Sequence, residues 1–519
     1  MTSRPSTLHA VVAAPDSWTD ALESRLGIDL RALAAFRIGL GLVLLIDLLT
    51  LRLPGLRTFY TDQGVFPRET LAETYPLFEA LSVHALSGAA WFQALLLALA
   101  GLFAASLLVG YRTRLATVGA LVLTASLYAR NPLALNGGDT ILLTFLALGL
   151  FLPLSARWSV DARRHANEST SQKPTALDSR TCSLATAAIL VHFTLIYVTN
   201  AILKFQSDAW LGGFAVQRTL HLEQYLTPLG AALSDLSLVL IAVNWFWVAL
   251  LSSSVVLLVV TGRLRLALVA GFVGTHLGMA ATMRLGVFPL VMILGLLLFV
   301  PSPVWRQLEP VVETRTPDRL VAGRPVRGDG GTAGRGADDV ASTSSESSQG
   351  WWPTLNASRG VRVLSGVLVA CLFAILLFWH AAAVGVGGPA AVTDVDEDLG
   401  SWSFFAPNPP DAYSWYAIDA TLESGETVET HVDGTAVRAD RPPDGTAAYP
   451  STLWKRYGMD VRYVGDVYYE PLAAFSCEQV GEQSDQPVDS VTVVHVEQPV
   501  GPDGPLGEPD RQERIESAC

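Results

Sequence analysis

Lysine is rare in this chain of 519 residues, which contains only Lys173, Lys204 and Lys455. Lys204 ends a long apolar run, and placing a charged amine in a membrane helix costs about 2.5–3.5 kcal/mol. An amine in apolar surroundings also loses its proton more easily than in water, so it can act as a base near neutral pH. Lys204 is therefore the first candidate for catalysis. The structural alternative is a lysine whose head reaches the lipid headgroups.

The residues around Lys204 predict a polar stripe. Tyr197, Asn200 and Lys204 are spaced i, i+3 and i+7, so they share one face of a helix. Polar residues on a membrane helix are expected to face the interior of the helix bundle. Trp210 follows on the same segment. We expect Tyr197, Asn200 and Trp210 to bind a substrate or cofactor.

Two further polar residues interrupt apolar segments and complete the predicted catalytic set with Lys204. Asp139 follows Asn136-Gly-Gly at the start of an apolar run, where the helix dipole and free N–H groups stabilise a carboxylate. His276 lies in Gly274-Thr-His-Leu-Gly. Asn136 is expected to bind the ligand. The structural alternatives are helix capping by Asp139 and an interhelical hydrogen bond from His276.

The elements that must position these residues are membrane helices. The mean hydropathy is +0.36, and apolar runs near 20 residues, the length that spans a bilayer, recur along the chain. They predict an α-helical polytopic membrane protein with about nine transmembrane helices, at 31–51, 88–109, 115–132, 139–155, 183–203, 236–261, 264–283, 286–301 and 362–384.

The composition divides the chain into four predicted parts. Residues 1–302 form an eight-helix membrane domain, 303–360 a cytoplasmic disordered linker rich in Gly, Ser and charge, 361–384 the ninth helix, and 385–519 a small β-rich domain. Alternating residues at 414–422 and 427–432 predict a β-hairpin, and 491–496 a further strand. The last 20 residues are expected to lack regular structure. Cys477 and Cys519 could form a disulfide if their compartment is oxidising.

Basic residues orient the predicted helices. They gather in loops that all lie on the cytoplasmic side if the N-terminus is cytoplasmic. These basic residues are Arg112, Arg114, Arg157, Arg163, Arg164, Lys173, Arg180, Arg263, Arg265 and the arginines of 306–335. This orientation places residues 385–519 outside the cell. The protein is then a multi-pass protein of the cell membrane.

The predicted outer domain is strongly acidic, with 25 Asp and Glu against 7 Lys and Arg from residue 385 onward. An acidic surface with few lysines suggests a salt-adapted microbe such as a halophilic archaeon, and a GC-rich genome is the alternative explanation. The acidity and the aromatic residues of this domain suggest that it binds an extracytoplasmic protein or peptide. The aromatic residues are Trp402, Phe404, Phe405, Trp415 and Trp454. Nucleic acid is not an expected partner. No CxxC, HExxH or Cys/His cluster occurs, so no metal is expected.

Several motifs follow one another in the order found in a known family. They are Phe59-Tyr-Thr-Asp-Gln-Gly, Gly110-Tyr-Arg-Thr-Arg, Asn136-Gly-Gly-Asp, Trp158-Ser-Val-Asp, the segment from Lys204 to Trp210, Thr275-His, Gly286-Val-Phe-Pro, Pro301-Ser-Pro-Val-Trp and Trp402-Ser-Phe-Phe-Ala-Pro-Asn-Pro. Over residues 28–310 the chain resembles the vitamin K-dependent γ-carboxylase-like proteins, also called the horizontally transferred transmembrane (HTTM) domain family. Arg112, in the second motif, is expected to contribute to ligand binding.

The resemblance implies a lyase reaction. In the animal enzyme a buried lysine deprotonates vitamin K hydroquinone, and O2 converts it into a base strong enough to remove a glutamate γ-proton before CO2 adds. Lys204 falls at the position of that lysine. The implied cofactor is a reduced naphthoquinone, of the menaquinol or vitamin K type, with O2 and CO2 as co-substrates. The animal enzyme has a lysine pair where Leu203 precedes Lys204 here, and a histidine where this chain has Gly-Gly-Asp139.

Two hypotheses from different classes follow. The first is a membrane enzyme in which Lys204 is the base, while His276, Asn200 and Asp139 orient groups or stabilise charge. The second is a non-catalytic membrane protein that binds quinone or lipid, or scaffolds a partner. A transporter is disfavoured, because the sequence has no internal repeat. The enzyme hypothesis requires Lys204, His276 and Asp139 to converge on one enclosed site.

Overall fold

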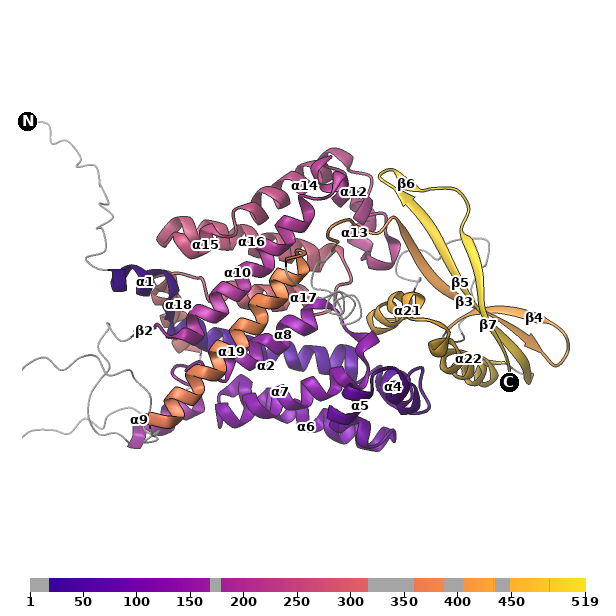
Figure 1. The fold of residues 1–519 in the computed structure, drawn as a ribbon, viewed down its shortest axis with the longest axis horizontal. Helices are drawn as coiled ribbons and strands as arrows, with labels where there is room; N and C mark the ends of the chain where they lie inside the picture. The colour runs from indigo at the N-terminus through magenta and orange to yellow at the C-terminus, as the bar shows by residue number, and fades with distance from the viewer. Residues whose placement is uncertain are drawn as a thin grey trace, which may run out of the picture.

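The computed structural model describes residues 18–168, 179–315, 359–386, 405–432, 434, 449–484 and 486–519. Figure 1 shows a body of helices with a β-sheet at one end and the helices α1 (Trp18–Leu26) and α9 (Val160–Glu168) at the other. The chain is therefore mostly helical with a β-sheet C-terminal region, as predicted.

Within the part of the chain that the structure describes, five helices have the length and composition of a membrane span. They are α2 with its π-helical continuation (Leu30–Arg52), α6 (Ala90–Val109), α10 (Leu184–Lys204), α16 (Gly262–Thr282) and α19, whose apolar part is Gly360–Ala383. A sixth arises if α17 (Phe288–Leu297) and α18 (Ser302–Arg315) form one broken span, bent by 102°.

The remaining predicted spans also lie on helices, but these helices are shorter or less apolar: α7 (Thr113–Arg130), α8 (Gly137–Gly149) and α14 (Ser237–Ser252), with α15 (Val256–Val259) after a break. The 13 residues of α8 rise about 20 Å, less than the ~30 Å hydrocarbon core. Connecting helices are α3 (Leu56–Tyr60), α4 (Arg68–Thr74), α5 (Pro76–Leu81), α11 (Asp208–Leu211), α12 (Ala215–Thr219) and α13 (Pro228–Leu233).

The helix that carries Lys204 is held inside the bundle. α10 packs against α14 and α19, and a two-residue ladder between β1 (Ile28–Asp29) and β2 (Arg180–Thr181) ties the start of α2 to the segment before α10. A buried chain of hydrogen bonds links Thr144 to His192 (3.2 Å), His192 to His380 (3.1 Å) and His380 to Thr199 (3.1 Å). It fastens α19 to α8 and α10, which lie beside it in Figure 1.

The C-terminal sheet is antiparallel. β3 (Ala412–Leu422) lies between β4 (Thr427–His431) and β5 (Val488–Gly501), and β5 also pairs with β6 (Gly504–Pro505) and β7 (Asp510–Ala518). The predicted hairpin and the strand at 491–496 are confirmed. The prediction that the last 20 residues lack regular structure is wrong, because the polar strand β7 satisfies its backbone groups on β5. A disulfide between Cys477 and Cys519 joins β7 to α22 (Tyr469–Gln483).

Helix α21 (Thr452–Val464) joins this region to the membrane helices, and Figure 1 shows it between the sheet and the bundle. Trp454 and Tyr457 pack against Phe59 with ring centroids 5.2 and 6.0 Å apart. Trp454 and Trp415 are buried, so they form core contacts and not an exposed docking surface. Trp402 and Phe404, also predicted for docking, lie outside the described residues. The domain boundaries stay a prediction.

Candidate functional site

Lys204 is the last residue of α10, and its side chain is enclosed. Only 3% of the residue is exposed. Its amine donates a hydrogen bond to the carbonyl oxygen of Phe405 (3.2 Å) and lies 4.0 Å from the ring centroid of Trp210. The indole N–H of Trp210 donates to the same carbonyl (2.8 Å). The amine therefore lies among protein groups, which argues against the alternative that it reaches the lipid headgroups.

The segment that covers Lys204 comes from the C-terminal region. Phe405 has a left-handed backbone (φ 54°), a conformation that costs a residue other than glycine about 1–2 kcal/mol. The two donors on its carbonyl offset part of this cost. Ser207 adds a third link by donating to the side-chain oxygen of Asn408 (2.5 Å). The carbonyl is thus held against the end of α10.

A second lysine approaches the same segment from α21. The rings of Phe405 and Tyr225 lie 5.1 Å apart, and the amine of Lys455 lies 4.4 Å from the Tyr225 centroid. Lys455 also donates to the carbonyl of Arg284. Burial, together with the charges of Arg456 and Arg284, lowers the pKa of Lys455 well below its usual value. Sequence reasoning missed this residue, although the scarcity of lysine could have drawn attention to it.

Tyr197 and His276 form a direct pair inside the bundle. The Tyr197 hydroxyl lies 2.9 Å from Nε2 of His276, and the Tyr197 ring stacks on Phe272 at 4.3 Å. Among the described residues, Nδ1 of His276 has no hydrogen-bond partner although it is buried. Asn200 is buried as well, and Lys204 follows Tyr197 by two helical turns, about 10 Å. The predicted polar stripe on α10 therefore faces the interior.

Asp139 lies in an ion-pair network. Its carboxylate accepts from Arg52 (2.8 Å) and from Arg456 of α21 (2.9 Å), and Arg52 also pairs with Asp47 (2.9 Å). Asn136 caps α8 by accepting from the backbone of Gly138 (2.8 Å), while Asp139 accepts from the backbone of Asn136. Asp139 therefore has the capping role given above as its structural alternative, and Asn136 shares this role. The structure places Asp139 among arginines, whereas Lys204 lies against Trp210 and Phe405.

Arg112 lies at the opposite end of the molecule from α21. It is exposed at the start of α7, and its backbone N–H donates to Asp161 of α9 (2.9 Å). The 18 residues of α7 separate it from Arg130 by about 27 Å. The structure does not bring Arg112 close to Lys204, Trp210 and Phe405.

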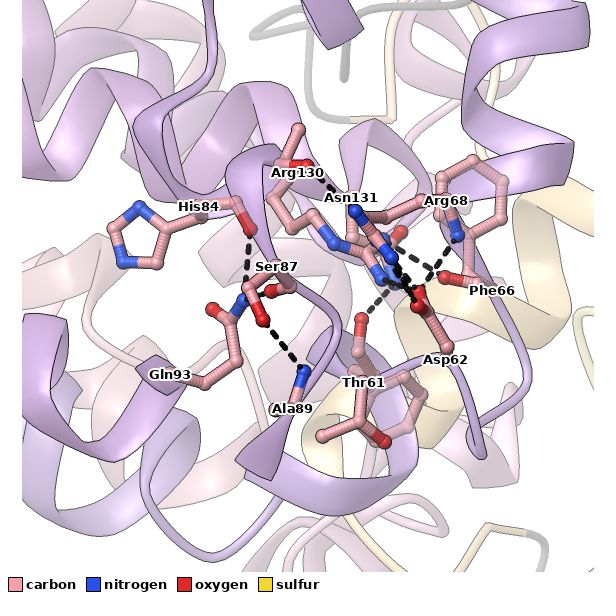
Figure 2. Close-up of polar contacts among 12 residues, drawn as sticks. Thr61, Asp62, Phe66, Arg68, His84, Ser87, Ala89, Gln93, Arg130 and Asn131 are labelled. Atoms are coloured by element: carbon pink, nitrogen blue, oxygen red, sulfur yellow. Dashed lines mark hydrogen bonds and ion pairs between the residues drawn. The ribbon is translucent and has the colours of Figure 1, made fainter. Parts of the chain in front are cut away.

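Figure 2 shows another polar cluster, built by the loop before α6 and the end of α7. Asp62 pairs with Arg68 (2.7 Å) and lies 3.6 Å from Arg130, which also donates to the carbonyl of Phe66 (2.8 Å). Burial opposes the ionised form of Asp62, but the hydrogen bonds from Arg68 prevail and lower its pKa. Gln93 donates to the backbone of His84 (2.7 Å). These contacts hold the loop before α6 against the end of α7.

The described residues contain no group of three or more His, Cys, Asp or Glu side chains arranged to hold a metal ion. That the protein uses no metal stays a prediction.

The apolar helices indicate a membrane protein. The HTTM domain is recognised at residues 27–305, more than half of the chain, close to the 28–310 of the resemblance. The chain therefore belongs to the HTTM family, a domain associated with vitamin K-dependent carboxylase-like membrane proteins. Neither a curated protein nor a solved structure shows significant similarity to it.

Proposed function

We propose that this protein is a membrane enzyme in which Lys204 acts as a base on a reduced naphthoquinone. When bound, the quinol and O2 would supply a base strong enough to deprotonate a glutamyl side chain or another carbon acid, which CO2 would then carboxylate. The observation that carries the proposal is the enclosure of the Lys204 amine between Trp210 and the Phe405 carbonyl.

Lys204 has the surroundings that proton abstraction from a lipid-soluble acid requires. Its amine is shielded from water, which would otherwise compete for the proton and quench a strong base. Its amine contacts a carbonyl and an indole face. In this role Lys204 takes the proton of a quinol hydroxyl, and the indole face stabilises the resulting ammonium.

The surrounding residues fit a naphthoquinone head group. Such a group needs flat apolar walls and donors to its oxygens. Trp210 supplies a ring 4.0 Å from the amine, and the segment that covers the amine carries the Phe405 ring, which packs on Tyr225. His276 offers a buried ring nitrogen that lacks a partner among the described residues, and Tyr197 fixes the orientation of its imidazole. We assign His276, Tyr197 and Asn200 to orienting the ligand, and Asp139 to holding the fold around it.

The proposal includes a nine-helix topology with a cytoplasmic N-terminus. The basic segments predicted to be cytoplasmic meet at one end: Arg25 donates to the carbonyl of Val259 (3.0 Å), Arg265 to that of Arg25 (3.1 Å) and Arg180 to that of Gly27 (2.7 Å). The sheet lies at the other end in Figure 1, so the C-terminal region is assigned to the outside, where it would meet a protein or peptide substrate.

The second candidate is a non-catalytic protein that binds quinone or lipid or scaffolds a partner. It is favoured by the position of Asp139, because two arginines engage its carboxylate and give it a structural role. The enzyme remains the better supported function because the enclosed amine suits proton transfer better than simple lipid contact.

Epoxide formation distinguishes the two candidates. Purified protein in detergent receives reduced menaquinone and O2, and mass spectrometry measures menaquinone epoxide for wild type, Lys204→Met and the matched control Lys173→Met. The enzyme hypothesis predicts epoxide from wild type and the control but not from Lys204→Met. Equal epoxide from wild type and Lys204→Met would contradict the role of Lys204, and none from any of the three favours the binding protein.

A further inference from the structure

Two of the three lysines in the chain are buried and contact residues of one aromatic pair, Phe405 and Tyr225. Lys204 ends α10 and Lys455 lies on α21, and they are 3% and 4% exposed. The Lys204 amine donates to the backbone of Phe405, the ring of Phe405 contacts Tyr225, and the Lys455 amine lies over Tyr225. The contacts thus run without a break from one amine to the other, through residues that are far apart in the sequence.

Lys455 contributes to the docking of α21 through the carbonyl of Arg284, but docking does not require an amine at this position. Its neighbour Arg456 already anchors the helix through Asp139 and the carbonyl of Ala134 (3.3 Å). Among the residues that the structure describes, no carboxylate forms an ion pair with Lys455. A buried amine without such a partner destabilises the folded protein, and groups of this kind gather at functional sites.

The two amines also match the chemistry of the proposed ligand. A reduced naphthoquinone carries two oxygens at opposite edges of one ring, so its recognition calls for two polar groups on opposite sides of an aromatic surface. Each member of the Tyr225–Phe405 pair contacts one of the two amines: Lys204 donates to the Phe405 carbonyl, and Lys455 lies over the Tyr225 ring. An amine can donate to a phenolic oxygen whether it is neutral or protonated, and it holds the anionic oxygen more strongly when protonated.

We propose that Lys455 is a second ligand-binding residue of the Lys204 site, which donates a hydrogen bond to the second oxygen of a naphthoquinone head group. This inference rests on the proposed function of Lys204. It makes α21 a part of the quinone site, so that the C-terminal region completes the site in addition to any contact with a substrate outside the membrane.

Lysine-selective labelling of the full chain tests the proposal. Protein labelled with 13Cε,15Nζ-lysine gives three side-chain signals in NMR spectra. Replacing each lysine in turn by arginine assigns these signals. We expect menaquinone-4, added in detergent, to shift the signals of Lys204 and Lys455 and to leave that of Lys173 in place. A shift of Lys204 alone overturns the role of Lys455 and leaves the proposed function standing. If neither signal moves, the proposed quinone site fails as well. A shift of all three signals reports a general effect of the lipid and also overturns the proposal.

A binding measurement on folded variants gives an independent readout. Loss of one hydrogen bond to the ligand corresponds to about a tenfold weaker affinity, so Lys455→Met is expected to raise the Kd for menaquinone-4 about tenfold. The matched control is Arg462→Met on the same helix, whose ion pair is with Glu497 of the sheet. An unchanged Kd for folded Lys455→Met, or an equal loss in the control, contradicts the proposal.

Discussion

The junction between the membrane helices and the C-terminal region buries basic side chains in two contrasting ways. In the ion-pair network, Arg52 and Arg456 meet the carboxylates of Asp47 and Asp139 at 2.8–2.9 Å. In the amine cluster, Lys204 and Lys455 contact carbonyls and aromatic rings. Helix α21 supplies consecutive residues to both, Lys455 to the amine cluster and Arg456 to the network.

The contrast distinguishes buried charges that stabilise the fold from buried amines that the protein retains for another purpose. Buried charges that neutralise one another become costly only when one partner is removed. An amine held by carbonyls and rings keeps much of its desolvation cost, so apolar replacements are tolerated or stabilising. The network should therefore control stability and the amine cluster should control ligand chemistry.

The largest expected effect is on the network. Asp139→Ala leaves Arg52 and Arg456 buried without this carboxylate, so we expect a loss of about 3–5 kcal/mol in unfolding free energy. The matched control, Asp419→Ala, removes a carboxylate whose partner Arg511 is partly exposed, and it should cost about 0–1 kcal/mol. Thermal unfolding of both variants in one detergent measures the difference. Similar melting temperatures for the two would break the comparison.

His84, a buried base of the cluster in Figure 2, extends the comparison, because the charge of Arg130 acts on it. Burial and the charge of Arg130 lower its pKa to about 4, whereas an unfolded histidine titrates near 6.5. Between these values the unfolded chain binds more protons, so stability should fall as pH drops through this window, by up to about 3 kcal/mol. Melting temperatures at pH 7 and pH 4 for wild type and His84→Gln isolate this contribution. A pH dependence unchanged in His84→Gln would rule it out.

Lys455 should show a smaller effect at the other end of the pH scale. Because its pKa is lowered in the folded protein, the unfolded chain binds the extra proton from that lowered pKa up to the ordinary lysine value near 10.4. The unfolding free energy of wild type should therefore increase relative to that of Lys455→Met as pH rises from 7 to 10. The measurement is the difference in melting temperature between the two proteins across this range. A constant difference would mean that Lys455 is charged in the folded state.

The sequence could predict the local part of the site. The rarity of lysine identified Lys204, and helical spacing placed Tyr197 and Asn200 on its face. Contacts between residues that are far apart in the sequence could not be predicted in this way. Nothing local indicates that Arg456 reaches Asp139 or that Phe405 supplies a carbonyl to Lys204. Lys455 lies in a polar segment by composition and is buried only because α21 packs on the bundle.

The most direct test of the central claim is the melting temperature of Lys204→Met compared with wild type. Methionine fills similar space without an amine, and the Phe405 carbonyl keeps its hydrogen bond from Trp210. If Lys204 is retained for ligand chemistry, the variant should melt at the same temperature as wild type or higher, while activity is lost. A fall of several degrees would show that Lys204 stabilises the fold, and the account would be contradicted.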